Sequence, residues 1–323
     1  MKIRIFEIRT LLESKLKKLG FTASESKIIA DEYIQGELKG KSSHGIFTFI
    51  RVYEKIKRRQ RGRYKIIINK AAYAYIEGNK DIGQIVADKA IRLAISKAKK
   101  RGVAMVGGGN IQAFLRPATW AEIAARENMV ALCFNFGGGP LMAPTGAREA
   151  ILSTNPIGIG IPYKPYPFVI DMATSNRAFY NVRLARKLNT TIPKDWGIDR
   201  WGKPTADPNK LVAVLPFGGY KGYALALALE ILTGPLVKTR VGRRSDAMRG
   251  FLFIVIDPKV FTTRKEFDRD IRALIRDVKT AKKIKGVKNI LIPGERAFQT
   301  EQERLKSGFF DLDERVINEI RVL

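Results

Sequence analysis

The amino-acid sequence predicts a mixed α/β or α+β fold. Three observations support this fold class: helical patterns at the N-terminus, short strands bounded by glycine and proline in the middle, and an apolar segment at residues 221–232 that should form a buried helix. Strands and helices do not alternate regularly, which argues against a simple doubly wound parallel sheet. With 323 residues, of which 45% are hydrophobic, the chain can bury a sizeable core.

Helices are expected at the start of the chain. Leucines recur at helical spacing between Leu11 and Leu19, and Gly20 follows them as a stop signal. Thr22 and Glu25 then have the spacing of a capping box, in which the two side chains satisfy free amides at a helix N-terminus. A second apolar stripe follows this capping box and predicts a second helix.

The rest of the chain alternates between short apolar strands and amphipathic helices. Residues 64–76 alternate in polarity like one strand, and Gly102 stops a helix predicted over 88–100. Pro117 suits the first turn of a further helix, and residues 263–266 have the spacing of another capping box. Further strands are predicted at 103–106, 129–136, 157–162, 168–173 and 251–256.

The net charge of +28 is the compositional outlier. Such a charge can attract nucleic acid or small anions, but it also fits a basic, solvated surface, which we favour. The densest basic run, residues 55–65, lacks the interleaved aromatic side chains that stack on bases, so a nucleic-acid partner is not expected, although the charge leaves it open.

Cysteine content, metal-ligand spacing and hydropathy narrow the class of protein. Cys133 is the single cysteine, and no cysteine and histidine pattern has zinc-site spacing, so we expect no metal site. The first residues lack the apolar core of a signal peptide, and no apolar run is long enough to span a membrane. We therefore expect a cytoplasmic protein with no membrane partner.

The tripeptide Ser43-His44-Gly45 contains the only histidine of the chain. A lone histidine is usually structural. Imidazole can also transfer a proton near neutral pH, which reduction of a carbonyl or imine requires alongside hydride transfer. In that case Ser43 would orient the ring or extend a proton relay, and the tripeptide alone leaves both interpretations open.

Two glycine-rich stretches, residues 107–109 and 137–139, each follow a predicted strand. Glycine permits close backbone approach to a phosphate or a ring, but it serves plain turns equally well. No G-x-G-x-x-G lies between a strand and a helix, so the common dinucleotide fingerprint is absent. The ending Gly40-Lys41-Ser42 looks like a phosphate-binding loop, but Gln35 occupies the position where that loop needs glycine.

Eight short segments, taken in order and spacing, are far more specific than any of them alone. They are ELKGKSSHG at 37–45, MAPTG at 142–146, STNP at 153–156, DMATS at 171–175, IPKDW at 192–196, GKPTADP at 202–208, LPFGGYKG at 215–222 and IPGE at 292–295. From about Glu7 to the C-terminus the chain closely resembles the type-2 malate/L-lactate dehydrogenase family, which also includes ureidoglycolate, sulfolactate and diketogulonate dehydrogenases and the cyclic ketimine reductases.

This resemblance implies a homodimeric oxidoreductase that uses NAD or NADP and has a non-Rossmann dinucleotide-binding fold. We expect a helical N-terminal region at 1–65 that packs with the C-terminal segment 300–323, and a dinucleotide-binding and catalytic region at 66–299. The resemblance implies that the cofactor contacts Ile170, Asp171, Met172, Ala173, Thr174, Ser175, Asn176, Tyr220, Lys221, Gly294, Glu295 and Arg296.

The chain departs from the family pattern at two catalytic positions. The family has an arginine three residues after Ser-His-Gly, which grips the substrate carboxylate, whereas this chain has Thr48. Its Asn-x-x-His-Phe-Gly motif carries the histidine commonly assigned as general acid/base, but this chain has Ala113 there. Loss of a positioned acid/base typically costs about 10²- to 10⁴-fold in rate, and threonine cannot supply the planar fork of arginine.

Other side chains could take over the missing roles. His44, with Ser43 and Asp171, is the candidate set for proton transfer, while Thr48, Arg51 and Arg116 are the candidates for binding the small anionic substrate. The leading hypothesis is an NAD(P)-dependent enzyme that transfers hydride to or from a 2-oxo acid, a 2-hydroxy acid or a cyclic imino acid. The alternative is a divergent, impaired relative that binds dinucleotide or polyanion with little turnover. The sequence names neither the substrate nor the form of the cofactor.

Overall fold

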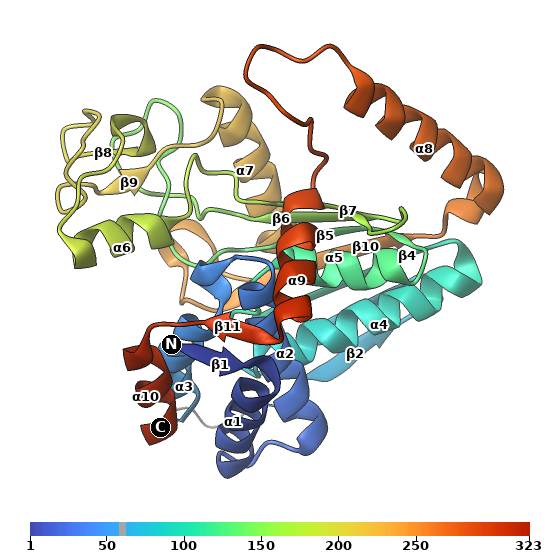
Figure 1. Ribbon diagram of the computed structural model, residues 1–323, viewed down its shortest axis with the longest axis horizontal. Helices are drawn as coiled ribbons and strands as arrows, with labels where there is room; N and C mark the ends of the chain where they lie inside the picture. The colour runs from blue at the N-terminus through green and yellow to red at the C-terminus, as the bar shows by residue number, and fades with distance from the viewer. Residues whose placement is uncertain (58–62) are drawn as a thin grey trace.

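A computed structural model describes residues 1–57 and 63–323 and confirms the mixed α/β fold class. Its centre is a seven-stranded sheet with the strand order β2-β3-β4-β10-β5-β6-β7 (Figure 1). Neighbouring strands are antiparallel except for β3 and β4, which are parallel, so the sheet is not doubly wound. The strands are β2 (Lys65–Asn69), β3 (Tyr73–Glu77), β4 (Val103–Ile111), β5 (Val130–Asn135), β6 (Ile157–Ile161), β7 (Phe168–Met172) and β10 (Arg249–Ile256).

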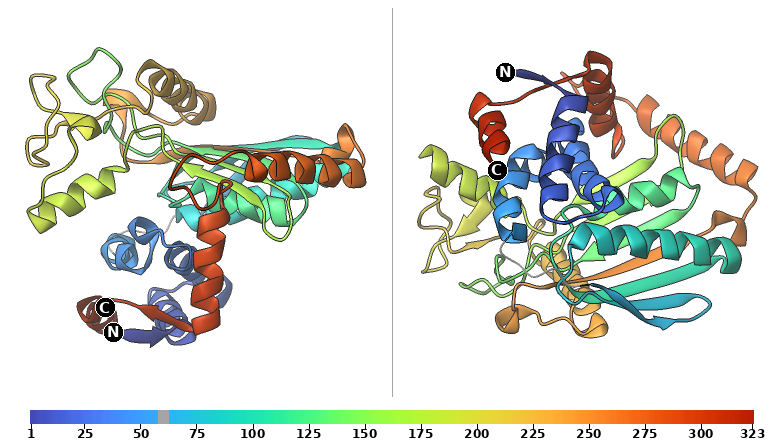
Figure 2. Two further views of the ribbon diagram at one scale, coloured as in Figure 1. Left: turned by 45° about the horizontal axis from the view of Figure 1, so that its top comes forward. Right: turned by 90° about the horizontal axis from the view of Figure 1, so that it is seen from below.

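Helices α4 (Gly83–Arg101) and α5 (Pro117–Arg126) cover one face of this sheet (Figure 2). Phe251 and Phe253, two residues apart on β10, both lie on that face and pack against the ring of Phe114. A side chain at Gly158 or Gly160 of β6 would clash with the backbone of α5, so these glycines let the helix lie directly on the strand. The start of α5 is thereby fixed against the sheet.

The N-terminal helices share one apolar core with the end of the chain. They are α1 (Ile5–Lys18), α2 (Ala23–Leu38) and α3 (Ile46–Lys57), and β1 (Lys2–Arg4) pairs with β11 (Phe309–Asp311). Helix α9 (Glu295–Ser307) leads from the level of the large sheet down to β11, and α10 (Glu314–Val322) follows (Figure 1). Both members of the predicted capping box, Thr22 and Glu25, form it at the start of α2. The domain boundary at residue 65 stays a prediction.

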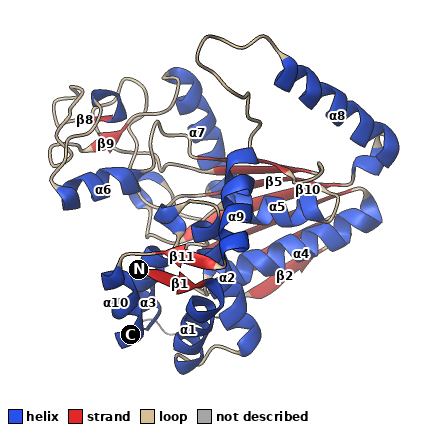
Figure 3. Cartoon of the chain, in the orientation of Figure 1, coloured by secondary structure: helices blue, strands red, loops and turns tan. Residues whose placement is uncertain are grey.

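A smaller lobe lies at one end of the sheet. It contains α6 (Phe179–Leu188), β8 (Gly197–Ile198), β9 (Ala213–Val214) and much loop structure, drawn in tan in Figure 3. Helix α7 (Tyr220–Thr233) packs between this lobe and the second face of the sheet. The remaining helices are α8 (Arg264–Thr280), η1 (Ser42–His44), η2 (Lys194–Trp196), η3 (Pro235–Val237), η4 (Gly242–Arg244) and η5 (Pro258–Val260).

Three sequence-based predictions of local structure were wrong. Residues 64–76 form two strands, β2 and β3, because the chain turns back at 70–72 and the two strands pair antiparallel. The helix predicted from residue 88 begins at Gly83, and its first turn is buried. The glycines at 107–109 lie inside β4 and not after it. Side chains at these positions would clash with Val237, Phe251 and Thr239, which explains why the strand has glycines there.

Helix α7 is less buried than its composition predicts. Tyr220 is 67% exposed, and Leu227 and Ile231 also reach the surface, because the helix contacts the sheet on one side only. In the described part of the chain no helix has the length and apolarity needed to cross a membrane. Part of the basic run at 55–65 lies outside the described residues, which omit 58–62.

Candidate active site

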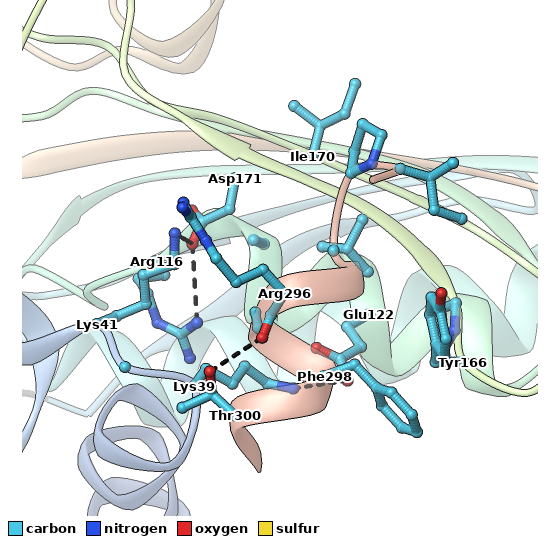
Figure 4. Close-up of a pocket in the computed structure, with 18 of the residues that line it drawn as sticks. Lys39, Lys41, Arg116, Glu122, Tyr166, Ile170, Asp171, Arg296, Phe298 and Thr300 are labelled. Carbon is cyan, nitrogen blue, oxygen red and sulfur yellow. Dashed lines mark hydrogen bonds and ion pairs between the residues drawn. The ribbon is translucent and has the colours of Figure 1, made fainter. Parts of the chain in front are cut away.

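A cleft of about 740 Å³ opens where the N-terminal helices, the sheet and α9 meet. Its walls come from the end of α2, the start of α5, strand β7 and the loop before α9 (Figure 4). Small-molecule sites in proteins typically have volumes of about 300–1,000 Å³, so this cleft is large enough for a small acid and part of a cofactor. We take it as the candidate active site.

Opposite charges converge at one end of the cleft (Figure 4). The carboxylate of Asp171, in β7, lies 3.8 Å from Nη1 of Arg116 and 3.8 Å from Nζ of Lys41. The Arg116 side chain is 4% exposed, whereas the other two partners are partly open to solvent. Among the residues of this cluster that line the cleft, two cations face one carboxylate, which favours an anionic ligand, while a second carboxyl, Glu32, lies buried behind Arg116.

Helix η1 (Ser42–His44) carries Ser43 and His44 close enough to this charge cluster for Arg116, Asp171 and Lys41 to act on the imidazole, although neither Ser43 nor His44 lines the cleft itself. A side chain at Gly36 of α2 would clash with the carbonyl of His44, so the glycine lets α2 pack directly on the turn. The hydroxyl of Ser43 lies 2.9 Å from Nδ1 of His44, and the hydroxyl of Thr48 donates to the carbonyl of Ser43 at 2.8 Å. Ser43 therefore contacts the imidazole as expected, and Thr48 holds the backbone that carries it.

Burial of the imidazole ring, together with the positive charge of Arg116, lowers the pKa of His44 to about 4. The negative charge of Asp171 opposes this shift, while Lys41 and Arg51 add to it. The imidazole is therefore neutral at pH 7 and can accept a proton. Its sensitivity to these four groups means that the charge cluster and the only histidine act on each other electrostatically.

Arg116 is aimed into the cleft by an unusual backbone. Leu115, the residue before it, has a φ of 71°, a conformation that costs side-chain-bearing residues on the order of 1–3 kcal/mol. Phe114 anchors one side of this turn in the core of the sheet, and Leu115 packs against the core of the N-terminal helices. The turn places the guanidinium between Asp171 and the buried Glu32.

Lys39 closes the other side of the cleft floor. Its ammonium lies 2.7 Å from Glu301 of α9 and 3.2 Å from Glu122 of α5, and all three side chains are largely buried. Figure 4 shows Lys39 beside Thr300 and below Arg296. This triad joins the end of α2 to α5 and α9, and so fixes three of the walls.

The structure brings together five of the residues expected at the cofactor. Ile170, Asp171, Met172, Gly294 and Arg296 line the cleft. Gly294 has a φ of 91° and approaches β7 so closely that a side chain would press on Val169, which explains the glycine at the start of α9. Glu295 is not among the residues that line the cleft: it accepts the backbone N–H of Ile292 and pairs with Lys279.

The other expected cofactor residues lie outside this cleft. Thr174 donates its hydroxyl to the carbonyl of Thr154, Ser175 donates to Arg177, and Asn176 donates to the carbonyl of Asp195. Ala173 continues the same segment away from β7. Tyr220 and Lys221 are exposed at the start of α7 and are absent from the cleft lining. Their contact with a cofactor stays a prediction.

Ala113 and Arg51, two positions singled out by comparison with the family pattern, are both exposed. Ala113 is exposed beside Gly83, at the end of β4. Arg51 is exposed on α3, where it acts electrostatically on His44, Tyr180 and Arg183. Of the three candidates for substrate binding, only Arg116 lines the cleft.

Several residues of the site have no local sequence signal that identifies them. Lys41 lies in the false phosphate-loop ending, and Glu32 lies in a helix that is buried on most sides. Lys39, Glu122 and Glu301 pair over separations of 83 and 262 residues, so no local pattern could have joined them. Among the described residues, no group of three or more metal-binding side chains occurs.

The chain belongs to the malate/L-lactate dehydrogenase family, whose sequence model matches residues 3–321. It is 35% identical to a malate/(S)-sulfolactate dehydrogenase of Methanothermus fervidus over 328 residues, which cover 98% of this chain and 95% of that protein. It is 31% identical to hydroxycarboxylate dehydrogenase B of Escherichia coli, over 94% of this chain and 89% of that protein.

Solved structures show the same relationship. The sulfolactate dehydrogenase of Methanocaldococcus jannaschii superposes with a TM-score of 0.90 at 34% identity, covering 99% of this chain and 95% of that one. A malate dehydrogenase of Entamoeba histolytica superposes with a TM-score of 0.94 at 27% identity, covering 99% and 96%. These comparisons confirm the predicted family and fold, and the chain is an oxidoreductase.

Proposed function

We propose that this protein transfers hydride between a nicotinamide cofactor and a small 2-hydroxy or 2-oxo acid. The observation that carries the proposal is the convergence of Arg116, Lys41 and Asp171 beside the only imidazole of the chain. Dehydrogenase membership implies the nicotinamide cofactor, and the relatives named above act on malate, sulfolactate and hydroxycarboxylates. A cyclic imino acid remains the alternative substrate class.

The residues of the cleft suit a dinucleotide. Ile170, Met172 and neighbouring apolar side chains offer a surface for a flat ring, and Arg296 offers a cation for a phosphate. Gly294 opens helix α9, where free backbone N–H groups favour an anion. We assign these residues, with Asp171, to the cofactor. The choice between NAD and NADP stays open because neither form has a diagnostic contact.

The nicotinamide supplies the hydride acceptor or donor, and the protein supplies charge and proton transfer. In the oxidation direction the substrate hydroxyl loses its proton to neutral His44 while hydride leaves the adjacent carbon; reduction reverses both transfers. Ser43 hydrogen bonds to Nδ1, so we assign the transfer to Nε2. Arg116 binds the substrate carboxylate or sulfonate, the role that Thr48 cannot fill because its hydroxyl holds Ser43.

Cofactor titration followed by a substrate panel tests this proposal. We expect saturable quenching or enhancement of NADH or NADPH fluorescence, then turnover of at least one acid among pyruvate, oxaloacetate, sulfopyruvate and a cyclic imino acid. His44→Ala should retain cofactor binding. Binding without turnover across the panel would instead support an impaired relative that only holds the dinucleotide, and no binding would contradict both readings.

We further propose a cytoplasmic homodimer whose interface includes the outer face of α7. Tyr220, Leu227 and Ile231 are exposed there, together with Leu236 in η3. Tyr220, Leu227 and Ile231 recur at helical spacing and so share one face of α7, and monomeric proteins rarely expose large contiguous apolar patches. Ile231→Glu should weaken the dimer by roughly 100-fold or more, because an unpaired buried charge costs several kcal/mol.

Light scattering after gel filtration measures this change as a shift from twice the chain mass of 36.3 kDa toward the single chain mass. Val322→Glu is the matched control, since Val322 is also exposed but lies on α10. A dimer that Ile231→Glu leaves intact would assign the interface to another surface.

A further inference from the structure

A buried carboxyl lies behind Arg116 and has no part in the mechanism above. Glu32, in the middle of α2, is 2% exposed, and its Oε1 lies 3.4 Å from Nε of Arg116. Thr119 bridges the two side chains: its hydroxyl accepts from Nη2 of Arg116 at 2.8 Å and donates to Glu32 at 3.0 Å. One edge of the guanidinium therefore rests on Glu32 and Thr119, and the other faces Asp171 and the cleft (Figure 4).

This arrangement leaves polar atoms without partners. Within the described part of the chain, Oε2 of Glu32 and Nε of Arg116 are buried and make no hydrogen bond. An ionised carboxylate has about four acceptor sites, so one whose second oxygen has no partner away from water is costly. A protonated carboxyl avoids most of that cost. The geometry thus suits a Glu32 that can be either charged or neutral.

The neighbouring groups act on Glu32 in opposite directions. Burial raises the pKa of Glu32 to about 7, although Arg116 and the hydrogen bond from Thr119 lower it, and the charge of Asp171 raises it further. Tyr33, next to it on α2, is buried and hydrogen bonded to Gln84 of α4, and burial raises its pKa so that it stays neutral.

The other charged groups around this site belong to other ion pairs or lie on the surface. The pKa of His44 in η1 is lowered to about 4 by burial and Arg116, so the ring is neutral. Lys41 pairs with Asp171 at the cleft, Arg51 is exposed on α3, and Lys39 and Glu301 pair between α2 and α9. Glu32 combines a raised pKa of about 7 with a buried carboxyl oxygen that has no hydrogen-bond partner.

We propose that Glu32 takes up a proton when an anionic substrate binds at Arg116, and so sets the pH range in which the site accepts anions. A carboxylate bound at Arg116 adds a negative charge close to Glu32 and Asp171. Protonation of Glu32 removes one of these charges and frees the Arg116 guanidinium for the ligand. The hydrogen bond to Thr119 keeps the guanidinium in place. Glu32 is a positioning residue, and this inference rests on the proposed function.

Proton uptake makes anion affinity depend on pH. Each pH unit above the pKa of a single coupled proton weakens binding by at most about tenfold, so the Kd of oxalate should rise roughly three- to tenfold between about pH 6 and pH 8. Oxalate is a suitable probe because it is a small dianion throughout this range. Calorimetry in two buffers of different ionisation enthalpy, on the full chain with and without cofactor, should show about 0.3–1 proton taken up at pH 8.

Glu32→Gln is the decisive variant, because glutamine has the shape of the neutral acid. Its oxalate Kd at pH 8 should fall to the value of the unmodified protein at pH 6, should vary less than about twofold with pH, and should show no proton uptake. The KM of an active substrate should follow the same pattern while kcat changes little. Thr119→Val should weaken binding at every pH, and Thr119→Ser should restore it.

Asp31→Asn is the matched control. Asp31 precedes Glu32 on α2 but pairs with Arg9 and Lys27 on the outer side, so its loss should leave the pH dependence intact. A pH-independent Kd in the unmodified protein, no oxalate binding at all, or an unchanged pH dependence in Glu32→Gln would overturn the inference. Turnover with a pH-independent KM would leave the proposed function standing, whereas proton-coupled oxalate binding without turnover would leave only this inference.

Discussion

Replacement of His44 by alanine is expected to lower kcat by about 10²- to 10⁴-fold, the range found when a positioned acid/base is removed. Ala113 occupies the place of the family histidine and is exposed, so no other imidazole is available to rescue the reaction. Cofactor affinity should change little, because the residues assigned to the cofactor lie on β7 and α9. Steady-state kinetics and cofactor fluorescence separate the two effects.

The pH profile provides the internal check on His44. The base must be unprotonated in the oxidation direction, and its pKa of about 4 means that this form is present above pH 4 and is lost only as the pH falls through that value. An acid limb near the ordinary histidine pKa of about 6.5 would mean that the imidazole is not in this environment. Activity of His44→Ala within tenfold of the unmodified enzyme would assign the proton transfer to another group.

Replacement of Arg116 by glutamine is expected to raise the KM of an anionic substrate by roughly 30-fold to 1,000-fold or more, since truncating one partner of a buried charge pair costs about 2–5 kcal/mol. The change in kcat should be smaller, because the guanidinium is assigned to binding. Arg116→Lys should recover only part of the affinity, as an ammonium keeps the charge but lacks the planar fork. Steady-state KM and kcat of the unmodified protein, Arg116→Gln and Arg116→Lys with one active acid test these expectations.

Two further variants make the Arg116 result specific. Arg92→Gln removes an exposed arginine of α4 that pairs with Asp88, and should leave KM unchanged. Arg51→Gln tests the competing candidate: a larger rise in KM than for Arg116→Gln would move carboxylate binding to α3. A protein that unfolds without Arg116 would show this in thermal melts, and Arg116→Lys would then carry the test.

Much of the fold could be predicted from local sequence signals. The capping boxes at Thr22 and Thr263, the stop at Gly102 and Pro117 at the start of α5 all act within a few residues, and the structure confirms each of them. The glycines at 107–109 were expected to follow a strand, either in a turn or beside a ligand, but they lie inside β4, where Val237 and Phe251 approach closely from distant parts of the chain. Such packing is invisible to a short window of sequence.

The residues of the candidate site could also be predicted only where a local motif identifies them. Motif order led to the family and to Asp171, and the departure at Thr48 led to Arg116, which does line the cleft. Glu32 and Lys39 could not be found, because their meaning depends on partners in α5 and α9 that the fold supplies. The apolar sequence of α7 predicted burial, but it could not show that the sheet and the smaller lobe leave Tyr220, Leu227 and Ile231 uncovered.

The Lys39–Glu122–Glu301 triad has a consequence for how the cleft comes into being. Its members come from the first, second and last parts of the polypeptide, so the crevice exists only after distant regions have docked. Contacts of such long sequence separation form slowly, because the entropy of closing large loops is lost before the contacts stabilise the chain. Ligand-binding competence should therefore appear late during refolding, together with the final tertiary structure and well after the local helices.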